Sequence, residues 1–187
     1  MSDNSYIYDA IFIDRDGTLN PDPGYISSLK DFRLYPFTLD ALKKLSTLSA
    51  HLCIVTNQSG VSRGLIDESE LDKIHSYLIS KIEERNVNIS GLYICTDLPG
   101  SGSQRRKPKP GMFHEAEKDL SLKLDQCLMI GDSISDLEGG SNLNMDTMLV
   151  LTGRGQETQA NLPHEFVVSF TVKNLLEGAE MLLDINN

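Results

Sequence analysis

The chain has 187 residues and carries 17 Lys+Arg against 27 Asp+Glu, which gives a formal net charge of −10. Its 40% hydrophobic and 24% charged residues are the proportions of a folded domain rather than a disordered chain, and its length suits a single domain over residues 1–187. The acidic balance argues against binding to nucleic acid or to an anionic membrane, because both would repel the chain. A small anionic substrate stays compatible with it, since a pocket can be locally positive.

The expected location is the cytoplasm. No apolar run approaches the ~20 residues that a membrane helix needs. Residues 1–14 have no basic region before their short apolar stretch, so we expect no secretory signal. Cys53, Cys95 and Cys127 are odd in number and widely spaced, each in or at the end of an apolar run. They are expected to be small core residues in a reducing compartment, without disulfides.

The first half of the chain predicts three strands separated by two helices. The strands are short apolar runs at residues 7–13, 51–56 and 91–95. The first helix is predicted from leucines at every third position, Leu39, Leu42, Leu45 and Leu48. The second is predicted to begin at Asp67, which with Glu70 has the spacing of a capping box. Its inner face would carry Leu71, Ile74, Leu78 and Ile82.

The second half begins with a predicted loop from Thr96 to Gly111, where proline and glycine residues break any regular element. A helix follows, with an apolar face of Met112, Phe113, Ala116 and Leu120. The remaining predicted elements are strands at 126–130 and 146–151, a short edge strand at 165–170 and a closing helix at 172–183.

Strands alternating with helices predict an α/β fold, a three-layer, doubly wound parallel sheet covered on both faces. In such sheets ligands bind beyond the carboxyl ends of the strands. Polar clusters directly follow the first, second and fourth predicted strands, at 14–18, 56–60 and 131–133. We therefore expect these three clusters to meet at one end of the sheet.

The first cluster offers two carboxylates, Asp14 and Asp16, beside Gly17, which tolerates unusual backbone angles. An ionised Asp can act as a nucleophile, and a second carboxyl group can give and take the proton. Asp132 adds a third acid, and clustered acids favour a cation between them. Without His or Cys nearby, the oxygen ligands suit Mg²⁺.

The second cluster and the long loop offer groups that hold phosphate. Thr56 supplies a hydroxyl and Asn57 an amide, and Gly60 permits close approach of the backbone. Lys107 offers a compact positive charge and Arg106 a bidentate one. An acidic nucleophile, a cation, a hydroxyl and a lysine are what phosphoryl transfer through an aspartyl-phosphate needs.

These residues carry a resemblance. Residues 14–20 (DRDGTLN), 56–60 (TNQSG) and 131–136 (GD, then a second Asp) are similar to the ordered motifs of the haloacid dehalogenase-like phosphohydrolases. With GYI at 24–26, TNQSGVSRG at 56–64 and RKPKPGM at 106–112, the chain resembles D-glycero-D-manno-heptose 1,7-bisphosphate phosphatases and the related histidinol-phosphate phosphatases. The resemblance runs from about residue 7 to about residue 155.

The resemblance implies a role for each matching position. Asp14 would be the nucleophile and Asp16 the general acid/base. Mg²⁺ would be held by the Asp14 carboxylate, the Asp16 carbonyl and Asp132. Thr56 and Lys107 would steady the transferring phosphoryl group.

The resemblance also implies a substrate pocket. Arg106 would help to recognise the substrate, beside residues that match the lining of the family's pocket: Asp22, Pro23, Gly24, Tyr25, Asn57, Gln58 and Ser59. The spacing of the motifs leaves no room for a large cap domain, so loops including 96–110 would screen the substrate. The implied activity is hydrolysis of a small phosphorylated metabolite by a monomer, with the 7-phosphate of heptose bisphosphate as the best candidate. Alternatives are a histidinol-phosphate phosphatase and a non-catalytic protein that binds a phosphorylated metabolite.

The chain departs from the family at two places, the zinc loop and the residue after Asp132. Many relatives hold zinc in a loop that starts Cys-x-His and ends Cys-x-Cys, whereas this chain has Cys95-Thr96-Asp97 and then Ser103-Gln104-Arg105. One cysteine cannot form a four-ligand site, so no zinc is expected and the loop is either ordered by other contacts or mobile. Ser133 stands where heptose enzymes usually have Lys. Asp136, one helical turn after Asp132, either orders the site or contacts the metal.

Two further activities are weighed. A polynucleotide 3′-phosphatase shares a stretch like 56–64, but the charge of −10 disfavours a DNA substrate. A signalling receiver would place its Asp after the third strand, where Cys95-Thr96 stands. Arg63 could contact substrate or solvent. The four histidines lie outside the motifs and receive no catalytic role: His51, His75, His114 and His164.

Overall fold

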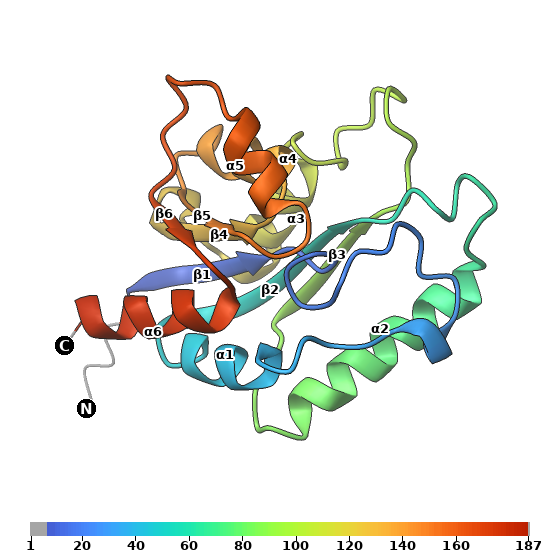
Figure 1. Ribbon diagram of the computed structural model, residues 1–187, viewed down its shortest axis with the longest axis horizontal. Coiled ribbons are helices and arrows are strands. Elements are labelled where there is room, and N and C mark those ends of the chain that lie inside the picture. The colour runs from blue at the N-terminus through green and yellow to red at the C-terminus, as the bar shows by residue number, and fades with distance from the viewer. Residues whose placement is uncertain (1–6, 187) are drawn as a thin grey trace.

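A six-stranded, all-parallel sheet forms the centre of the computed structural model, which describes residues 7–186 (Figure 1). Its strands are β1 (Tyr8–Ile13), β2 (Ser49–Asn57), β3 (Gly91–Cys95), β4 (Cys127–Gly131), β5 (Asp146–Val150) and β6 (Phe170–Val172). They lie in the order β3-β2-β1-β4-β5-β6. Residues 1–6, which belong to the segment where no secretory signal is expected, and residue 187 lie outside the described residues.

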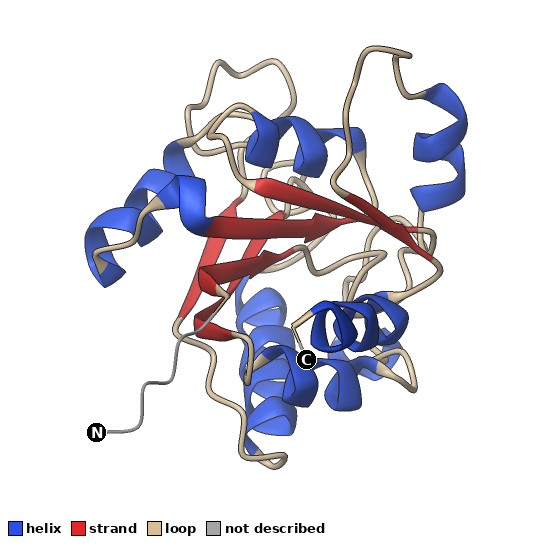
Figure 2. Cartoon of the chain, turned by 90° about the vertical axis from the view of Figure 1, so that its left-hand side faces the viewer, coloured by secondary structure: helices blue, strands red, loops and turns tan. Residues whose placement is uncertain are grey.

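Helices cover both faces of this sheet (Figures 1 and 2). The α-helices are α1 (Thr38–Leu45), α2 (Glu68–Glu83), α3 (Gly111–Leu120), α4 (Ile134–Ser141), α5 (Gly155–Asn161) and α6 (Leu175–Ile185), and the 3₁₀ turns are η1 (Leu29–Asp31) and η2 (Leu124–Gln126). In Figure 1 α1, α2 and α6 lie on one side of the sheet and α3, α4 and α5 on the other. The three-layer parallel architecture is therefore confirmed. Between β1 and β2 the chain holds η1 and α1 but no large cap domain.

Alternation along β1 explains why both faces need a cover. Ile11 and Ile13 point into the core under α1, α2 and α6, whereas Ala10 and Phe12 point into the core under α3. A strand buried on both faces reads as an unbroken apolar run, which is why the sequence pattern identified it. The three cysteines are free and buried in the core under α3, as expected of small core residues.

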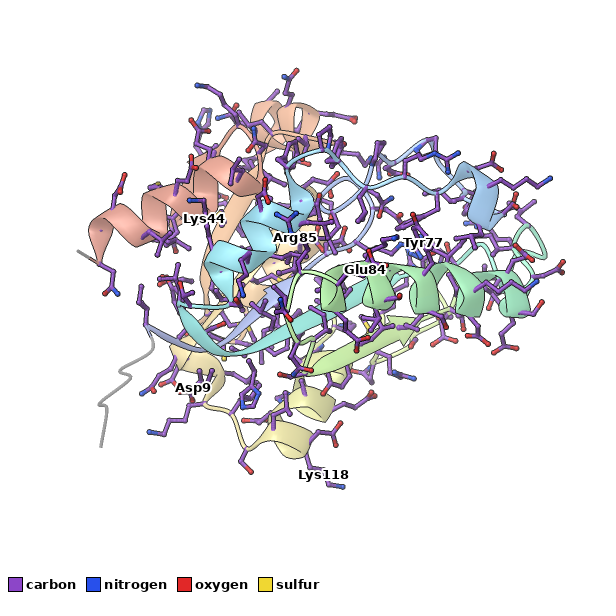
Figure 3. All side chains as sticks on the ribbon, turned by 90° about the horizontal axis from the view of Figure 1, so that it is seen from below. Asp9, Lys44, Tyr77, Glu84, Arg85 and Lys118 are labelled. Atoms are coloured by element: carbon purple, nitrogen blue, oxygen red, sulfur yellow. The ribbon has the colours of Figure 1, made fainter. Side chains whose placement is uncertain are left out.

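Two details of the predicted helices differ from the structure. Helix α1 ends at Leu45, so Leu48 is buried in the turn that follows, while Leu39 is only half-buried. Asp67 does precede α2, but its side chain makes no capping hydrogen bond. Instead Glu70 accepts from the backbone N–H of Leu29 and from Lys73, which compete for the carboxylate that a capping box would use. Figure 3 shows the outer side of these helices, where Arg85 pairs with Asp40 of α1.

In the last third of the chain, two element boundaries differ from the predicted ones. The predicted edge strand at 165–170 is wrong: β6 starts at Phe170 and pairs with β5, with Val172 beside Val150. The closing helix starts at Leu175 rather than at residue 172, because the Asn174 side chain accepts from the N–H groups of Leu176 and Glu177 and caps it there. Helices α4 and α5 were not predicted, since they are short and carry few apolar repeats. No helix within 7–186 combines the length and apolar character needed to cross a membrane.

Candidate active site

Asp14 directly follows β1, the strand between β2 and β4, and is 7% exposed. The Lys107 ammonium lies 2.7 Å from Asp14 Oδ1 and 2.6 Å from Asp136 Oδ1, and it donates to the Val55 carbonyl at 2.7 Å. An ammonium has three N–H donors, so each of them has a partner. Lys107 is itself buried, and its pairing makes burial of these acidic groups tolerable.

Two further carboxylates approach from β4 and α4. Asp132 accepts from the Arg154 N–H at 2.7 Å, and Asp136 accepts from the N–H and the hydroxyl of Ser133 in a capping box. Carboxylate oxygens of Asp14, Asp132 and Asp136 lie within 4.8 Å of one another, and all three residues are buried. Of the two roles left open for Asp136, ordering of the site is seen directly, through both Ser133 and Lys107.

The electrostatics of this cluster favour a cation. Burial raises the pKa of Asp132 to about 7, with a further contribution from the charge of Asp136 that outweighs the opposing hydrogen bond from Arg154. Burial likewise raises the pKa of Asp14, with Lys107 opposing it and the charges of Asp136 and Asp132 adding to it. Because three buried carboxylates without a His or Cys ligand suit a hard divalent ion, the residues present fit Mg²⁺.

Two glycines bring the main chain against Asp132. A Cβ atom on Gly17 would lie 2.0 Å from Asp132 Oδ2, and one on Gly153 would lie 2.2 Å from it. Gly17 also has a φ of +87°, which L side chains rarely adopt. The hydroxyl of Thr152 donates to the Gly17 carbonyl at 2.6 Å and ties the two segments together. The turn after β1 is thus shaped by the acid that arrives from β4.

Binding of Mg²⁺ should depend on pH, because the ion must displace protons from the cluster. Asp132 has a pKa of about 7, so below that pH a proton competes with the ion. We expect the Kd for Mg²⁺ to rise by roughly tenfold per pH unit as the pH falls from about 7 to about 5.5. At pH values above about 7 the Kd should stay constant. Calorimetric titration with Mg²⁺ across this range, with Asp132→Asn as the control of flatter pH dependence, would measure it. A Kd that is constant over this range would contradict the assignment.

Asp16 lies at the edge of the same site, with its side chain 21% exposed. Arg15 donates through Nε to Asp16 Oδ1 at 3.0 Å and through Nη2 to Oδ2 at 2.7 Å. Asn20 donates to Oδ1 at 2.8 Å, and Gln58 donates to Oδ2 at 2.6 Å. Donors from three side chains therefore fix the plane of this carboxylate.

A cavity of about 710 Å³ opens over these groups at the carboxyl ends of the strands. It brings together most of the predicted site residues: Asp14, Asp16, Asp22, Gly24, Tyr25, Thr56, Asn57, Ser59, Arg106, Lys107 and Asp132. Pro23 and Gln58 do not line it. Gln58 is buried and turns towards Asp16 and Thr56 instead. Asn57 also holds the Lys107 backbone, accepting from its N–H at 3.1 Å and donating to its carbonyl at 3.2 Å.

The cavity also has a wall that sequence patterns identified only in part. Its residues without a role from the sequence are Ile134, Ser135 and Arg154. Ser133, Asp136 and Pro99, which belongs to the loop expected to screen the substrate, line it as well. Arg154 follows β5, so the rule that ligands bind beyond strand ends could have found it. Arg63, whose position was left open, also lines the cavity. Three arginines, Arg63, Arg106 and Arg154, therefore face a cavity in a chain of net charge −10.

The loop at 96–110 is held by polar contacts. The Cys95 thiol donates to Asp97 Oδ2 at 3.5 Å and lies 3.9 Å from the Ser103 hydroxyl. Arg106 donates to the Asp97 carbonyl at 3.0 Å, and Arg105 pairs with Glu115 of α3. These contacts present Arg106 and Lys107 to the cavity.

Comparisons with known proteins identify the family of the chain. The model of a family described as HAD-hydrolase-like matches residues 104–177. The D-glycero-beta-D-manno-heptose-1,7-bisphosphate 7-phosphatase of Photorhabdus laumondii is 32% identical over 168 residues, 86% of this chain and 89% of the relative. The corresponding protein of Helicobacter pylori strain J99 is 34% identical over 90% of this chain and 95% of its own.

Solved structures lead to the same group of proteins. The D,D-heptose 1,7-bisphosphate phosphatase of B. bronchiseptica, complexed with magnesium and phosphate, superimposes with a TM-score of 0.85 at 30% identity. The match covers 94% of this chain and 98% of that one. A putative HAD-like phosphatase from Mesorhizobium loti follows with a TM-score of 0.75 at 27% identity, covering 95% of this chain and 88% of that one.

Proposed function

Since this chain belongs to the haloacid dehalogenase-like hydrolases, in the family of the D-glycero-beta-D-manno-heptose-1,7-bisphosphate 7-phosphatases, we propose that it removes the 7-phosphate of that bisphosphate. It is a phosphatase that hydrolyses phosphate monoesters. The observation that carries the proposal is the buried Asp14 carboxylate, which faces the cavity with Lys107 at 2.7 Å and the acids Asp132 and Asp136 beside it. This is the environment that an aspartyl-phosphate intermediate needs.

The three arginines of the cavity support a substrate with two phosphates. Arg63, Arg106 and Arg154 line the same cavity as the acidic cluster, and a second anionic group away from Asp14 would neutralise them. Histidinol phosphate carries a cationic amine at its far end, which arginines would repel. The volume of about 710 Å³ is ample for a bisphosphorylated seven-carbon sugar.

In the proposed reaction an Asp14 carboxylate oxygen attacks phosphorus, and the bond from phosphorus to the sugar oxygen breaks. Asp16 gives its proton to the departing alkoxide. Asp16 then takes a proton from a water molecule whose oxygen attacks phosphorus, and the bond between phosphorus and Asp14 breaks. Inorganic phosphate leaves, Asp14 is restored as a carboxylate, and Asp16 is again protonated.

Other residues would hold the phosphoryl group during both steps. The Thr56 hydroxyl accepts from Gln58 at 2.8 Å, so its own proton is available to a phosphoryl oxygen. Lys107 would exchange one of its present acceptors for a phosphoryl oxygen. Asp14, the Asp16 carbonyl and Asp132 would hold Mg²⁺. When bound, the ion supplies charge neutralisation of phosphoryl oxygens.

The remaining parts of the proposal concern recognition and assembly. Arg106 and the cavity wall would select the sugar, through Asp22, Gly24, Tyr25, Asn57 and Ser59. The proposal includes a monomer that acts as a single domain. Three free, buried cysteines support a cytoplasmic enzyme. No zinc is proposed, because hydrogen bonds among Cys95, Asp97 and Ser103 connect the positions where relatives place ligands.

A steady-state assay on a substrate panel tests the proposed function. The panel comprises heptose 1,7-bisphosphate, the heptose 7-monophosphate, other sugar phosphates and histidinol phosphate, each with Mg²⁺ and with a chelator. We expect the bisphosphate to have the highest kcat/KM by about tenfold or more over the monophosphate, since a hydrogen bond between charged groups contributes about 1.5–3 kcal/mol. Chelation should abolish turnover. A preference for histidinol phosphate would overturn the proposed substrate. An absence of turnover on the whole panel would overturn the proposed function.

A further inference from the structure

A buried arginine lies between the two proposed catalytic acids in the sequence. Arg15 is 1% exposed, and besides its bonds to Asp16 it donates through Nη2 to Gln58 Oε1 at 3.0 Å. Its Nη1 lies 2.9 Å from His75 Nε2, and its guanidinium carbon lies 5.9 Å from the centre of the Phe32 ring. Arg15 therefore joins Asp16 to α2, a helix none of whose residues lines the cavity.

His75 lies on the inner face of α2 and is 4% exposed. Because a guanidinium can only donate, His75 Nε2 must accept from Arg15, and the ring proton must sit on Nδ1. Burial and the charge of Arg15 lower the pKa of His75 to about 4, which keeps the ring neutral and able to accept. Nδ1 has no hydrogen-bond partner among residues 7–186, so Arg15 is the one polar contact of this imidazole in the described chain.

We propose that His75 is a positioning residue for the reaction proposed above: by accepting the Arg15 Nη1–H, it fixes the guanidinium in the plane that holds the Asp16 carboxylate at the cavity. The inference rests on the proposed function. One edge of the guanidinium, Nε and Nη2, meets Asp16, and Nη1 meets His75. Holding both edges prevents rotation about the end of the Arg15 side chain.

The role makes a specific demand on substrates. An alkoxide leaves poorly without a proton, so cleavage of a sugar phosphate needs Asp16 in place. A p-nitrophenolate leaves without protonation, so transfer of its phosphoryl group to Asp14 does not need Asp16. Hydrolysis of the resulting aspartyl-phosphate needs Asp16 as base in both cases. Loss of His75 should therefore slow the first step only for the sugar phosphate.

The test compares His75→Leu, His75→Gln and His75→Asn in the full chain with Mg²⁺. A Gln side chain places an oxygen near the position of Nε2, whereas that of Asn reaches only as far as Nδ1. For the heptose bisphosphate we expect kcat of His75→Leu and His75→Asn to fall by about 10- to 100-fold with KM within about twofold, and His75→Gln to regain most of it. With p-nitrophenyl phosphate, His75→Leu should release a stoichiometric burst of p-nitrophenol followed by a slow steady state.

Melting temperatures separate this role from a structural one. His75→Gln and His75→Asn are both polar and both buried, so a purely structural role predicts that activity follows stability in the two variants. Equal kcat in these two variants, or equal loss of the burst and of sugar phosphate turnover in His75→Leu, would overturn the inference. If the wild-type chain turns over the panel while all three variants match it, only this inference fails. If the wild-type chain turns over nothing, the proposed function fails and the inference falls with it.

Discussion

Replacing Asp14 by Asn is expected to lower kcat for phosphate release by about 10⁴-fold or more while leaving the fold intact. The amide oxygen is neutral and a weak nucleophile, so no phosphorylated chain can form. The replacement is nearly isosteric, and its oxygen can still accept from the Lys107 ammonium, which lies 2.7 Å from Asp14 Oδ1. Removal of one of three clustered, buried carboxylates also relieves repulsion. Melting temperature in chelator should therefore equal or exceed that of the wild type.

A matched control is Asp72→Asn, the same chemical change at an exposed acid of α2. It should leave kcat and KM unchanged. Intact-mass measurement after acid quench during turnover should find phosphate on the wild-type chain and none on Asp14→Asn. Full activity of Asp14→Asn, or phosphate on that variant, would rule out Asp14 as the nucleophile.

Replacing Lys107 by Met should abolish detectable turnover and lower the free energy of unfolding by about 3–5 kcal/mol in chelator. The side chains of Lys107 and Asp136 are each 1% exposed, and the ammonium is 2.6 Å from Asp136 and 2.7 Å from Asp14. Although burial alone would lower the pKa of Lys107, the carboxylates of Asp136 and Asp14 raise it, so the ammonium stays charged. Without it, two buried carboxylates lose their cation. Urea unfolding measures the loss, and Mg²⁺ should restore part of it through Asp14 and Asp132.

The double variant Lys107→Met/Asp136→Asn separates stability from catalysis. Removing the Asp136 charge should recover a large part of the lost stability, because one uncompensated carboxylate disappears. Turnover should stay undetectable, since no ammonium then faces the phosphoryl group. A double variant that is no more stable than Lys107→Met would show that the ion pair with Asp136 does not account for the loss.

The order of the elements follows from local sequence. Runs such as 7–13 and 51–56 are mostly apolar because β1 and β2 are buried on both faces. The motifs at their ends place Asp14, Thr56 and Asp132 at one edge of a parallel sheet, which is a consequence of strand direction alone. The absence of a large cap domain follows from the spacing of the first two motifs.

Element boundaries depended on partners that periodicity cannot see. Phe170 starts β6 because β5 offers an edge there, and Asn174 fixes the start of α6 through its side chain. The Glu70 carboxylate accepts hydrogen bonds from Leu29 and Lys73 and forms no capping box with Asp67. In each case a contact between distant residues, or a local side-chain competitor, decided where the pattern ended.

At the site, local sequence and tertiary structure contribute different information. The sequence by itself determined that Asp14, Asp16, Thr56, Lys107 and Asp132 are polar groups beside strand ends, because motif spacing and strand direction are properties of the chain. Only the tertiary structure decided which of them touch. In the folded chain Gln58 donates to Asp16 and does not line the cavity, and Asp136 forms an ion pair with Lys107. Arg15 contacts the ring of His75, a residue 60 positions away that no motif contains. Such pairings depend on side-chain packing between separate elements, and helical periodicity marks His75 only as a residue near the buried face of α2.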